Sequence, residues 1–150
     1  MFLANVLHES GGLQYKAEIK CQGNGGCPGE YSHVPGEPTY YGRGYMQLTW
    51  KENYRAASLA LLNNDELVKN PDLVATDEKL AWGVSFHYWF TRVHTSEGVI
   101  NGRFGDSISK INGALECGGG NTAAVAKRQE YFTKCLSAFG VNEQPDFSGC

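Results

Sequence analysis

One stretch near the start of the chain decides the fold, and it reads Phe2-Leu3-Ala4-Asn5-Val6-Leu7-His8-Glu9-Ser10-Gly11-Gly12. Its apolar residues fall at helical spacing, and the glycine pair predicts the end of the helix. Glu9 stands at that end, where partial burial of a carboxyl group would favour its protonated, acid form. A solvated glutamate at the end of a helix is the alternative, and the pattern by itself favours it.

A second glutamate, Glu18, follows nine positions later in a segment that is predicted to connect two elements. Its simplest interpretation is a surface charge. Nine residues can span any separation from contact to roughly 30 Å, so the spacing does not establish a catalytic pair.

The composition bounds the class of protein. The chain has 150 residues, which predicts a single domain over residues 1–150. Apolar residues make up 41% and aromatic residues 12%, which argues against intrinsic disorder. The net charge is −3 and no basic stripe is present, so nucleic acid is not an expected partner. No apolar run approaches the roughly 20 residues that cross a bilayer, so a membrane partner is not expected either.

Five cysteines in so short a chain indicate an oxidising compartment, so the protein is expected to be secreted. The odd number leaves one thiol over, and Cys135, on the apolar face of a predicted helix, is the candidate. A zinc site is the rival interpretation. The chain has no pair of cysteines at C-x-x-C spacing, and no second histidine follows His8-Glu9 at the spacing of H-E-x-x-H, so no metal is expected.

Helices separated by long loops are predicted for most of the chain. After the first helix, the periodicity predicts helices from about residue 50 to 62, from 76 to 90, from 106 onward and from 122 to 139. The helix over 76–90 is apolar on nearly all sides, which predicts a buried, central position. Residues 92–105 are predicted to form a loop. The expectation is a mainly α fold with four or five helices and little strand.

Polar residues with short side chains are predicted to cap three of these helices. Thr49 begins a capping-box sequence, Thr76 precedes the apolar helix, and Asp106 precedes the next one. In the last helix, Phe139 is predicted to face inward, and Gly140 is predicted to follow the final turn.

Several common catalytic motifs are missing. The chain has no G-x-S-x-G elbow and no phosphate loop, and Gly42-x-Gly44 lacks the third glycine of a dinucleotide-binding motif. Carboxylates, neutral polar groups and aromatic rings remain. This inventory is typical of glycoside hydrolysis, which needs two carboxyl groups on either side of the scissile bond.

Four segments, in the same order, resemble the motifs of glycoside hydrolase family 19 chitinases. Residues 2–13 (FLANVLHESGGL) are similar to the family's F-L-A-x-V-x-H-E-[ST]-G-G, and residues 40–50 (YYGRGYMQLTW) are similar to its Y-Y-G-R-G-x-x-Q-L-[ST]-W. Residues 70–75 (NPDLVA) and 111–117 (INGALEC) match two further family segments. Together the four segments extend the resemblance over nearly all of the chain.

The resemblance implies a lysozyme-like, mainly helical fold with two lobes and a substrate cleft. It implies endo-acting hydrolysis of β-1,4-linked N-acetylglucosamine polymers, that is of chitin, with inversion and without a cofactor. Glu9 would be the general acid, Glu18 the general base, and Thr49 would help to hold the attacking water. In inverting enzymes the two carboxyl groups stand about 6.5–9.5 Å apart, which leaves room for that water.

The other motif positions imply binding roles. Tyr41, Gln47 and Asn53 would line the sugar subsites, and Asn112 would bind the N-acetyl group of the substrate and water. Chitin or a chitooligosaccharide is therefore the expected partner, and the protein is expected to be a monomer.

The family pattern also implies supporting roles. Glu116 and Arg128 match a charged network behind the catalytic glutamates. The cysteine match implies two disulfides and a free Cys135, the disulfides being Cys21–Cys27 and Cys117–Cys150.

Some features depart from the family pattern. The family's catalytic domain usually has further residues before the first helix, so the resemblance implies that an N-terminal segment is missing. The short loop between Cys21 and Cys27, which has no tryptophan, resembles that of compact bacterial members. Gly83 stands where many members have a lysine that faces the cleft.

Two alternatives to chitin hydrolysis follow from these departures. Tyr45, after Gly-Arg-Gly, resembles endolysins of the same family, which makes peptidoglycan an alternative substrate. The missing N-terminal segment favours a third possibility, a chitin-binding or antifungal protein without catalysis.

Overall fold

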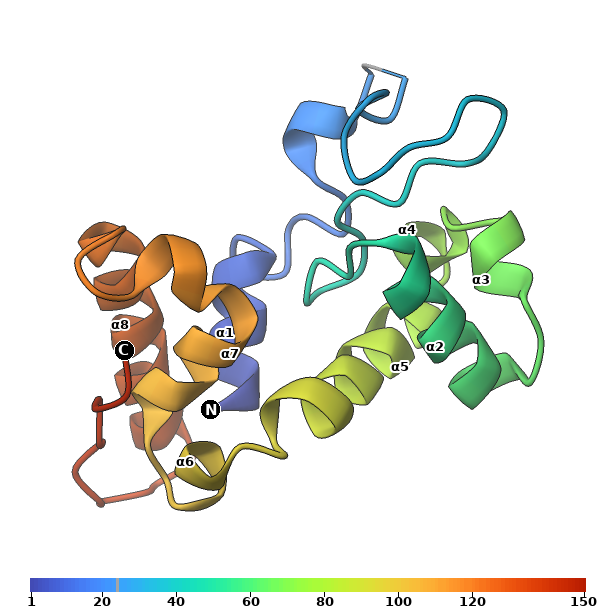
Figure 1. Cartoon of the computed structure of the whole chain (residues 1–150). Coiled ribbons are helices and arrows are strands. Elements are labelled where there is room, and N and C mark those ends of the chain that lie inside the picture. Colours follow the sequence, from blue (N-terminus) through green and yellow to red (C-terminus); the bar gives the residue numbers. More distant parts are fainter. Residues whose placement is uncertain (24) are drawn as a thin grey trace. The chain divides into compact units, whose positions relative to one another are not determined.

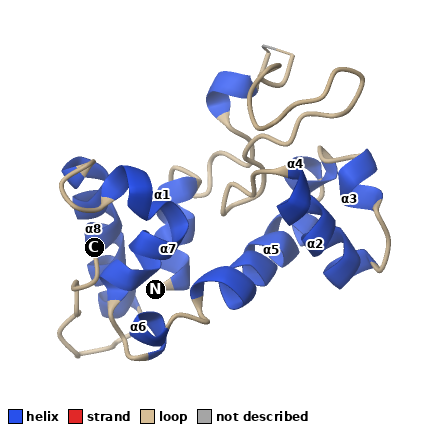
Figure 2. Cartoon of the chain, in the orientation of Figure 1, coloured by secondary structure: helices blue, strands red, loops and turns tan. Residues whose placement is uncertain are grey.

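The computed structural model describes residues 1–23 and 25–150; Asn24, in the loop between Cys21 and Cys27, lies outside the described residues. Helices dominate the described chain (Figure 2). Its only pairing between extended segments consists of isolated β-bridges such as that of Ala17 with Arg43. In chain order the helices are α1 (Phe2–Glu9), η1 (Ile19–Cys21), α2 (Lys51–Leu62), α3 (Glu66–Lys69), α4 (Leu73–Thr76), α5 (Glu78–Tyr88), η2 (Trp89–Val93), α6 (Glu97–Ile100), α7 (Phe104–Glu116) and α8 (Thr122–Ala138). η1 is a 3-10 helix and η2 is a π-helix.

The chain divides into two compact units (Figure 1). Unit 1 comprises residues 1–8 and 89–150, and unit 2 comprises residues 9–88. The division falls inside α1, so the last residue of this helix, Glu9, is the first residue of unit 2.

Unit 1 is built around α7 and α8, which pack on α1. Phe104 of α7 stacks on Phe132 of α8 with ring centroids 4.3 Å apart, and Phe147 of the C-terminal segment meets both rings edge-on. Ala4 of α1 completes this core cluster. A disulfide between Cys117 and Cys150 joins the end of α7 to the end of the chain.

Unit 2 packs α2, α3, α4 and α5 around a second core. Its buried side chains come from the helices and from the segment before α2, and they are Tyr40, Leu48, Tyr54, Ala57, Leu67, Val74 and Val84. A disulfide joins Cys21 to Cys27 in the loop that precedes this segment. Both disulfides are the pairs that the family resemblance implied, and Cys135 is a buried free cysteine, as expected.

The predicted helix caps are wrong at all three positions. The residue before α2 is Trp50, and the Thr49 hydroxyl donates a hydrogen bond to the carbonyl of Gln47 instead of accepting one from the helix. Thr76 is the last residue of α4, and the Asp77 carboxylate caps α5 by accepting from the Leu80 N–H. Asp106 lies inside the first turn of α7, which begins at Phe104.

Three expectations on burial and helix extent are also wrong. The apolar helix ends at Tyr88 and continues as η2, and Phe86 and Phe90 are 45% and 59% exposed. Phe139, predicted to face inward, is 71% exposed because it follows the end of α8. Residues 92–105, predicted to be a loop, contain α6.

Among the described residues, no helix combines the length and the apolar character that crossing a bilayer requires.

The stacked rings at the centre of unit 1 make a testable contribution to stability. We expect Phe104→Ala to lower the free energy of unfolding by about 3–5 kcal/mol, because truncation of a buried aromatic ring leaves a cavity. Phe139→Ala, the same chemical change at an exposed site, should have a far smaller effect. Urea unfolding followed by circular dichroism measures both, and equal losses would contradict the assignment of the core.

Candidate active site

Glu9 is half-buried at the last position of α1, and a tight turn follows it. Gly11 and Gly12 have φ values of +58° and +78°, a region that favours glycine. At Gly11 a side chain is further excluded, because its Cβ would lie 2.8 Å from the ring of Tyr15. The buried hydroxyl of Ser10 accepts a hydrogen bond from the Leu13 N–H, so the chain leaves Glu9 along a fixed path.

Glu18 is held by a set of hydrogen bonds that the sequence did not predict. The Tyr31 hydroxyl lies 2.8 and 2.7 Å from its two carboxylate oxygens, and the Gly42 N–H donates to Oε2 over 3.3 Å. The ammonium group of Lys20 lies 3.4 Å from Oε1. The side chain is 23% exposed, so the carboxylate keeps access to water while its orientation is fixed.

The properties of Tyr31 suit it to donate a hydrogen bond to the Glu18 carboxylate. Burial, followed by the hydrogen bond to Glu18, raises the pKa of Tyr31 to about 12, so the phenol keeps its proton at neutral pH. Its ring meets Trp50 edge-on, with centroids 5.6 Å apart. No local sequence pattern marks Tyr31, because it lies in a loop and reaches Glu18 only through the fold.

The segment 40–49 fastens Glu18 to the rest of unit 2. The Glu18 N–H donates to the carbonyl of Gly42 over 2.8 Å, and the Gly44 N–H donates to the carbonyl of Lys16 over 2.9 Å. Gly44 has a φ of +73°, and a Cβ there would lie 3.3 Å from the carbonyl oxygen of Ala81. The close approach of this segment to α5 therefore requires glycine at position 44.

Arg43 is the buried centre of the same segment, with 3% of its side chain exposed. Its guanidinium pairs with Asp72, with Nε 2.9 Å and Nη2 2.8 Å from Oδ1, and Nη1 donates to the Thr39 carbonyl and the Tyr54 hydroxyl. It also lies 3.6 Å from the centroid of the Tyr41 ring. The position of Tyr41, a predicted subsite residue, is thus set by a cation–π contact.

The other predicted residues of unit 2 lie close together along the chain and in space. Gln47 has a φ of +49°, and its amide donates to the Gly44 carbonyl. The side-chain amide of Asn53 donates to the carbonyl of Thr49 over 2.8 Å. Unit 2 therefore contains Glu18, Tyr41, Gln47, Thr49 and Asn53 on one hydrogen-bonded framework.

The predicted residues of unit 1 form a buried charged network. The Arg128 guanidinium makes a bidentate pair with Glu116 over 2.8 and 2.7 Å, with both side chains buried. The Asn112 amide donates to Glu116 over 2.8 Å, and Asn112 itself departs from helical geometry inside α7. Nη1 of Arg128 donates to the side chain of Asn5 on α1 over 3.1 Å, a partner that the sequence did not reveal.

Two titratable groups are shifted by this network. Burial raises the pKa of Glu116, but hydrogen bonds from Arg128 and Asn112 outweigh it and hold the pKa below its usual value. Burial, reinforced by the positive charge of Arg128, lowers the pKa of His8 to about 4. Nδ1 of His8 is buried and has no hydrogen-bond partner among the described residues, so the imidazole is neutral at pH 7.

Within residues 1–23 and 25–150, no three side chains of His, Cys, Asp or Glu gather in a way that could hold an ion.

Solved structures with the same fold are chitinases. Chitinase C from Streptomyces griseus HUT6037 is 39% identical, with a TM-score of 0.81 over 99% of this chain and 61% of that chain. A class IV family GH19 chitinase from Zea mays is 30% identical, with a TM-score of 0.80 over 99% of this chain and 71% of that one. These similarities confirm the predicted mainly α, lysozyme-like fold.

The family follows from the sequence comparison. The family described as chitinase class I, glycoside hydrolase family 19, matches residues 7–149, and the chain belongs to this family. Among curated relatives, Endochitinase EP3 of Arabidopsis thaliana is 38% identical over 143 residues, which are 94% of this chain and 50% of that protein. Chitinase 4 of Oryza sativa subsp. japonica is 35% identical, over 94% of this chain and 48% of that protein. The chain thus spans about half the length of these curated relatives.

The buried histidine makes stability depend on pH. Below its unfolded pKa of 6.5, His8 binds a proton in the unfolded chain but not in the folded one, so the free energy of unfolding falls as pH drops from 6.5 towards 4. We expect the drop in Tm between pH 7 and pH 4.5 to be smaller in His8→Gln than in the unsubstituted protein. His94→Gln, at an exposed histidine, should leave the drop unchanged, and an equal drop in all three proteins would contradict this origin.

Proposed function

We propose that this chain catalyses endo-acting hydrolysis of chitin by an inverting acid–base mechanism. Membership of glycoside hydrolase family 19 supports the reaction class. The observation that carries the proposal is the anchoring of Glu18. Two carboxylate oxygens that accept from Tyr31 and Gly42 form a fixed, partly exposed base of the kind that water activation requires.

Glu9 and Glu18 would divide the proton transfers between them. Glu9, half-buried at the end of α1, would give its proton to the oxygen that leaves the scissile bond. Glu18 would take a proton from the water that attacks the anomeric carbon from the opposite face. The bond to the leaving oxygen breaks as the bond to water forms, so a β-linkage gives an α-anomer at the new reducing end.

Thr49 is suited to orient that water. Its hydroxyl proton is used in the hydrogen bond to the Gln47 carbonyl. The hydroxyl oxygen is then left as an acceptor, and it would receive a hydrogen from the water while Glu18 receives the other.

The remaining predicted residues would bind the sugar chain or hold the catalytic glutamates in place. Tyr41, Gln47 and Asn53 would contact sugar rings from unit 2, and Asn112 would contact the N-acetyl group. Arg128 reaches α1 through Asn5, one helical turn before Glu9, so the pair of Arg128 with Glu116 would hold the acid-bearing helix in place.

The compartment and the assembly follow from the same features. Two disulfides in 150 residues favour an oxidising environment, so we place the protein outside the cell. It would act there as a monomer on an insoluble, uncharged polymer.

Replacement of either glutamate tests the mechanism. We expect Glu9→Gln and Glu18→Gln each to lower the rate of chitin hexamer hydrolysis by about 10²–10⁴-fold, because each removes one proton transfer. Binding of the hexamer by calorimetry should be retained. Mass spectrometry of the products measures the rates, and full activity of Glu9→Gln would overturn its assignment as the acid.

The same incubation separates the alternatives. An α-anomer at the new reducing end, detected by NMR at early times, is the expected product, and a β-anomer would reject inversion. Cleavage of bacterial cell walls in preference to the hexamer would assign the activity to peptidoglycan. Binding without any product would show that the chain is a non-catalytic chitin-binding protein.

Tyr31 provides a second, independent test. Tyr31→Phe removes the donor to Glu18 while keeping the ring against Trp50, and it should lower the rate of hexamer hydrolysis by about 10–100-fold. Tyr131→Phe, the same change in unit 1, is the control and should be without effect. An unchanged rate in Tyr31→Phe would show that the hydrogen bond does not orient the base.

A further inference from the structure

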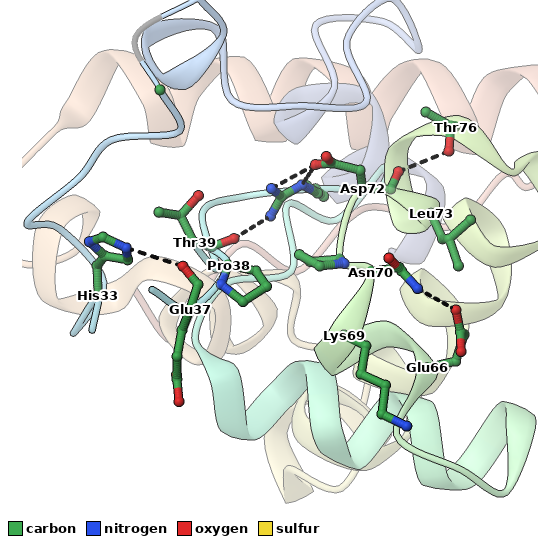
Figure 3. Close-up of a pocket in the computed structure, with 13 residues that line it drawn as sticks. His33, Glu37, Pro38, Thr39, Glu66, Lys69, Asn70, Asp72, Leu73 and Thr76 are labelled. Carbon is green, nitrogen blue, oxygen red and sulfur yellow. Dashed lines mark hydrogen bonds and ion pairs between the residues drawn. The ribbon is translucent and has the colours of Figure 1, made fainter. Parts of the chain in front are cut away.

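Unit 2 contains a pocket of about 540 Å³ that none of the candidate catalytic or subsite residues lines. Its walls come from the loop before Thr39 and from the region of α3 and α4 (Figure 3), and Arg43 also lines it. A volume of this size is typical of sites for small ligands. The chemistry of the walls indicates which ligand it can take.

An anion is not favoured by these walls. The one buried cation, Arg43, already donates to Asp72, to the Thr39 carbonyl and to the Tyr54 hydroxyl, so its charge is compensated and most of its N–H groups are used. The carboxylates of Glu37, Glu66 and Asp72 also line the pocket and would repel a negative ligand.

A metal ion or an apolar ligand fits no better. Lys69 brings a positive charge that makes no ion pair with the described residues, and the carboxylates of the lining do not form a group of three ligands. The apolar side chains of the lining are those of Pro38, Pro71 and Leu73, and charged or polar residues stand among them, so no continuous apolar wall forms.

The pocket lining offers hydrogen-bond donors and acceptors that can still bind a ligand. The Lys69 ammonium group can donate, one carboxylate oxygen of Asp72 (Oδ2) has no partner among the described residues, and the Thr39 hydroxyl can do both. Asn70, whose amide donates to Glu66, adds a side-chain carbonyl. Sugar hydroxyls both donate and accept, and the ring face of a sugar matches the flat, partly exposed surface of Pro38.

We propose that this pocket is an accessory binding site for a short, neutral saccharide, separate from the site that contains Glu9 and Glu18. The choice of a chitooligosaccharide as the ligand rests on the proposed function. Hydrolysis at Glu9 and Glu18 would release such fragments at unit 2, which also contains the pocket. Arg43 connects the two sites, since its guanidinium lines the pocket and also stacks on the ring of Tyr41.

The test is an amide NMR titration of Glu9→Gln with chitotriose, so that the probe is not consumed. Two sets of resonances should shift with separate saturation curves: the pocket set (His33, Leu73, Thr76) and the active-site set (Glu18, Gly42). Adding Lys69→Ala and Asn70→Ala together should weaken binding reported by the pocket set by about tenfold, which corresponds to the loss of one or two hydrogen bonds. The dissociation constant reported by the active-site set should stay within about twofold.

Two further variants keep the test sharp. Thr39→Val keeps the shape of the side chain and removes only its hydroxyl, so it should also weaken the chitotriose binding that the pocket set reports. Lys79→Ala removes an exposed positive charge from α5, outside the pocket. It should leave the dissociation constants reported by both sets unchanged. Unshifted active-site resonances in the absence of ligand report that each variant is folded.

The outcomes separate this proposal from the proposed function. Shifts confined to the active-site set, or pocket shifts that persist in all pocket variants, overturn the accessory site alone. Pocket shifts in a protein whose unsubstituted form does not hydrolyse chitin hexamer support the accessory site and overturn the proposed function alone.

Discussion

A buried guanidinium group must have its charge and its N–H groups satisfied inside the protein, and this constraint organises each unit around one arginine. Arg128 is 1% exposed and pairs with Glu116 in unit 1, while Arg43 is 3% exposed and pairs with Asp72 in unit 2. In the pair of Arg128 with Glu116 both side chains are buried, so loss of one partner leaves an uncompensated buried charge and is strongly destabilising; Asp72, by contrast, is 76% exposed. Each arginine therefore fixes the backbone segments that supply its acceptors.

These segments are also the ones that carry the candidate chemistry. Arg128 reaches Asn5, so the position of α1, which ends at Glu9, depends on it. Arg43 reaches the carbonyl of Thr39 and the ring of Tyr41, and its neighbours Gly42 and Gly44 hold the segment that contains Glu18. The arginines contribute orientation, while the glutamates would contribute the proton transfers.

Much of the helical structure could be predicted from the spacing of apolar residues, but the short helices and the helix caps could not. The extent of α2, the start of α8 and the end of α1 follow from patterns within one element. The single-turn helices α3, α4 and α6 could not be predicted, because elements of four residues are stable only through tertiary contacts. At Thr49 a hydrogen bond to Gln47 competes with the cap and wins, and this competition is invisible in the sequence. Among the site residues, Glu9 and Glu18 were found through the family motifs and not through spacing, whereas Tyr31 and Asn5 act across loops and helices that no local pattern connects.

One loop, residues 28–39, contributes residues both to the surroundings of Glu18 and to the pocket of unit 2. It supplies Tyr31, which orients the carboxylate of Glu18, and a few positions later His33, Glu37 and Thr39, which line the pocket. Any exchange of this loop with that of a relative would consequently alter both the orientation of the Glu18 carboxylate and the walls of the pocket. To change the pocket alone, an exchange would have to retain Tyr31 and replace only the part of the loop that lines the pocket.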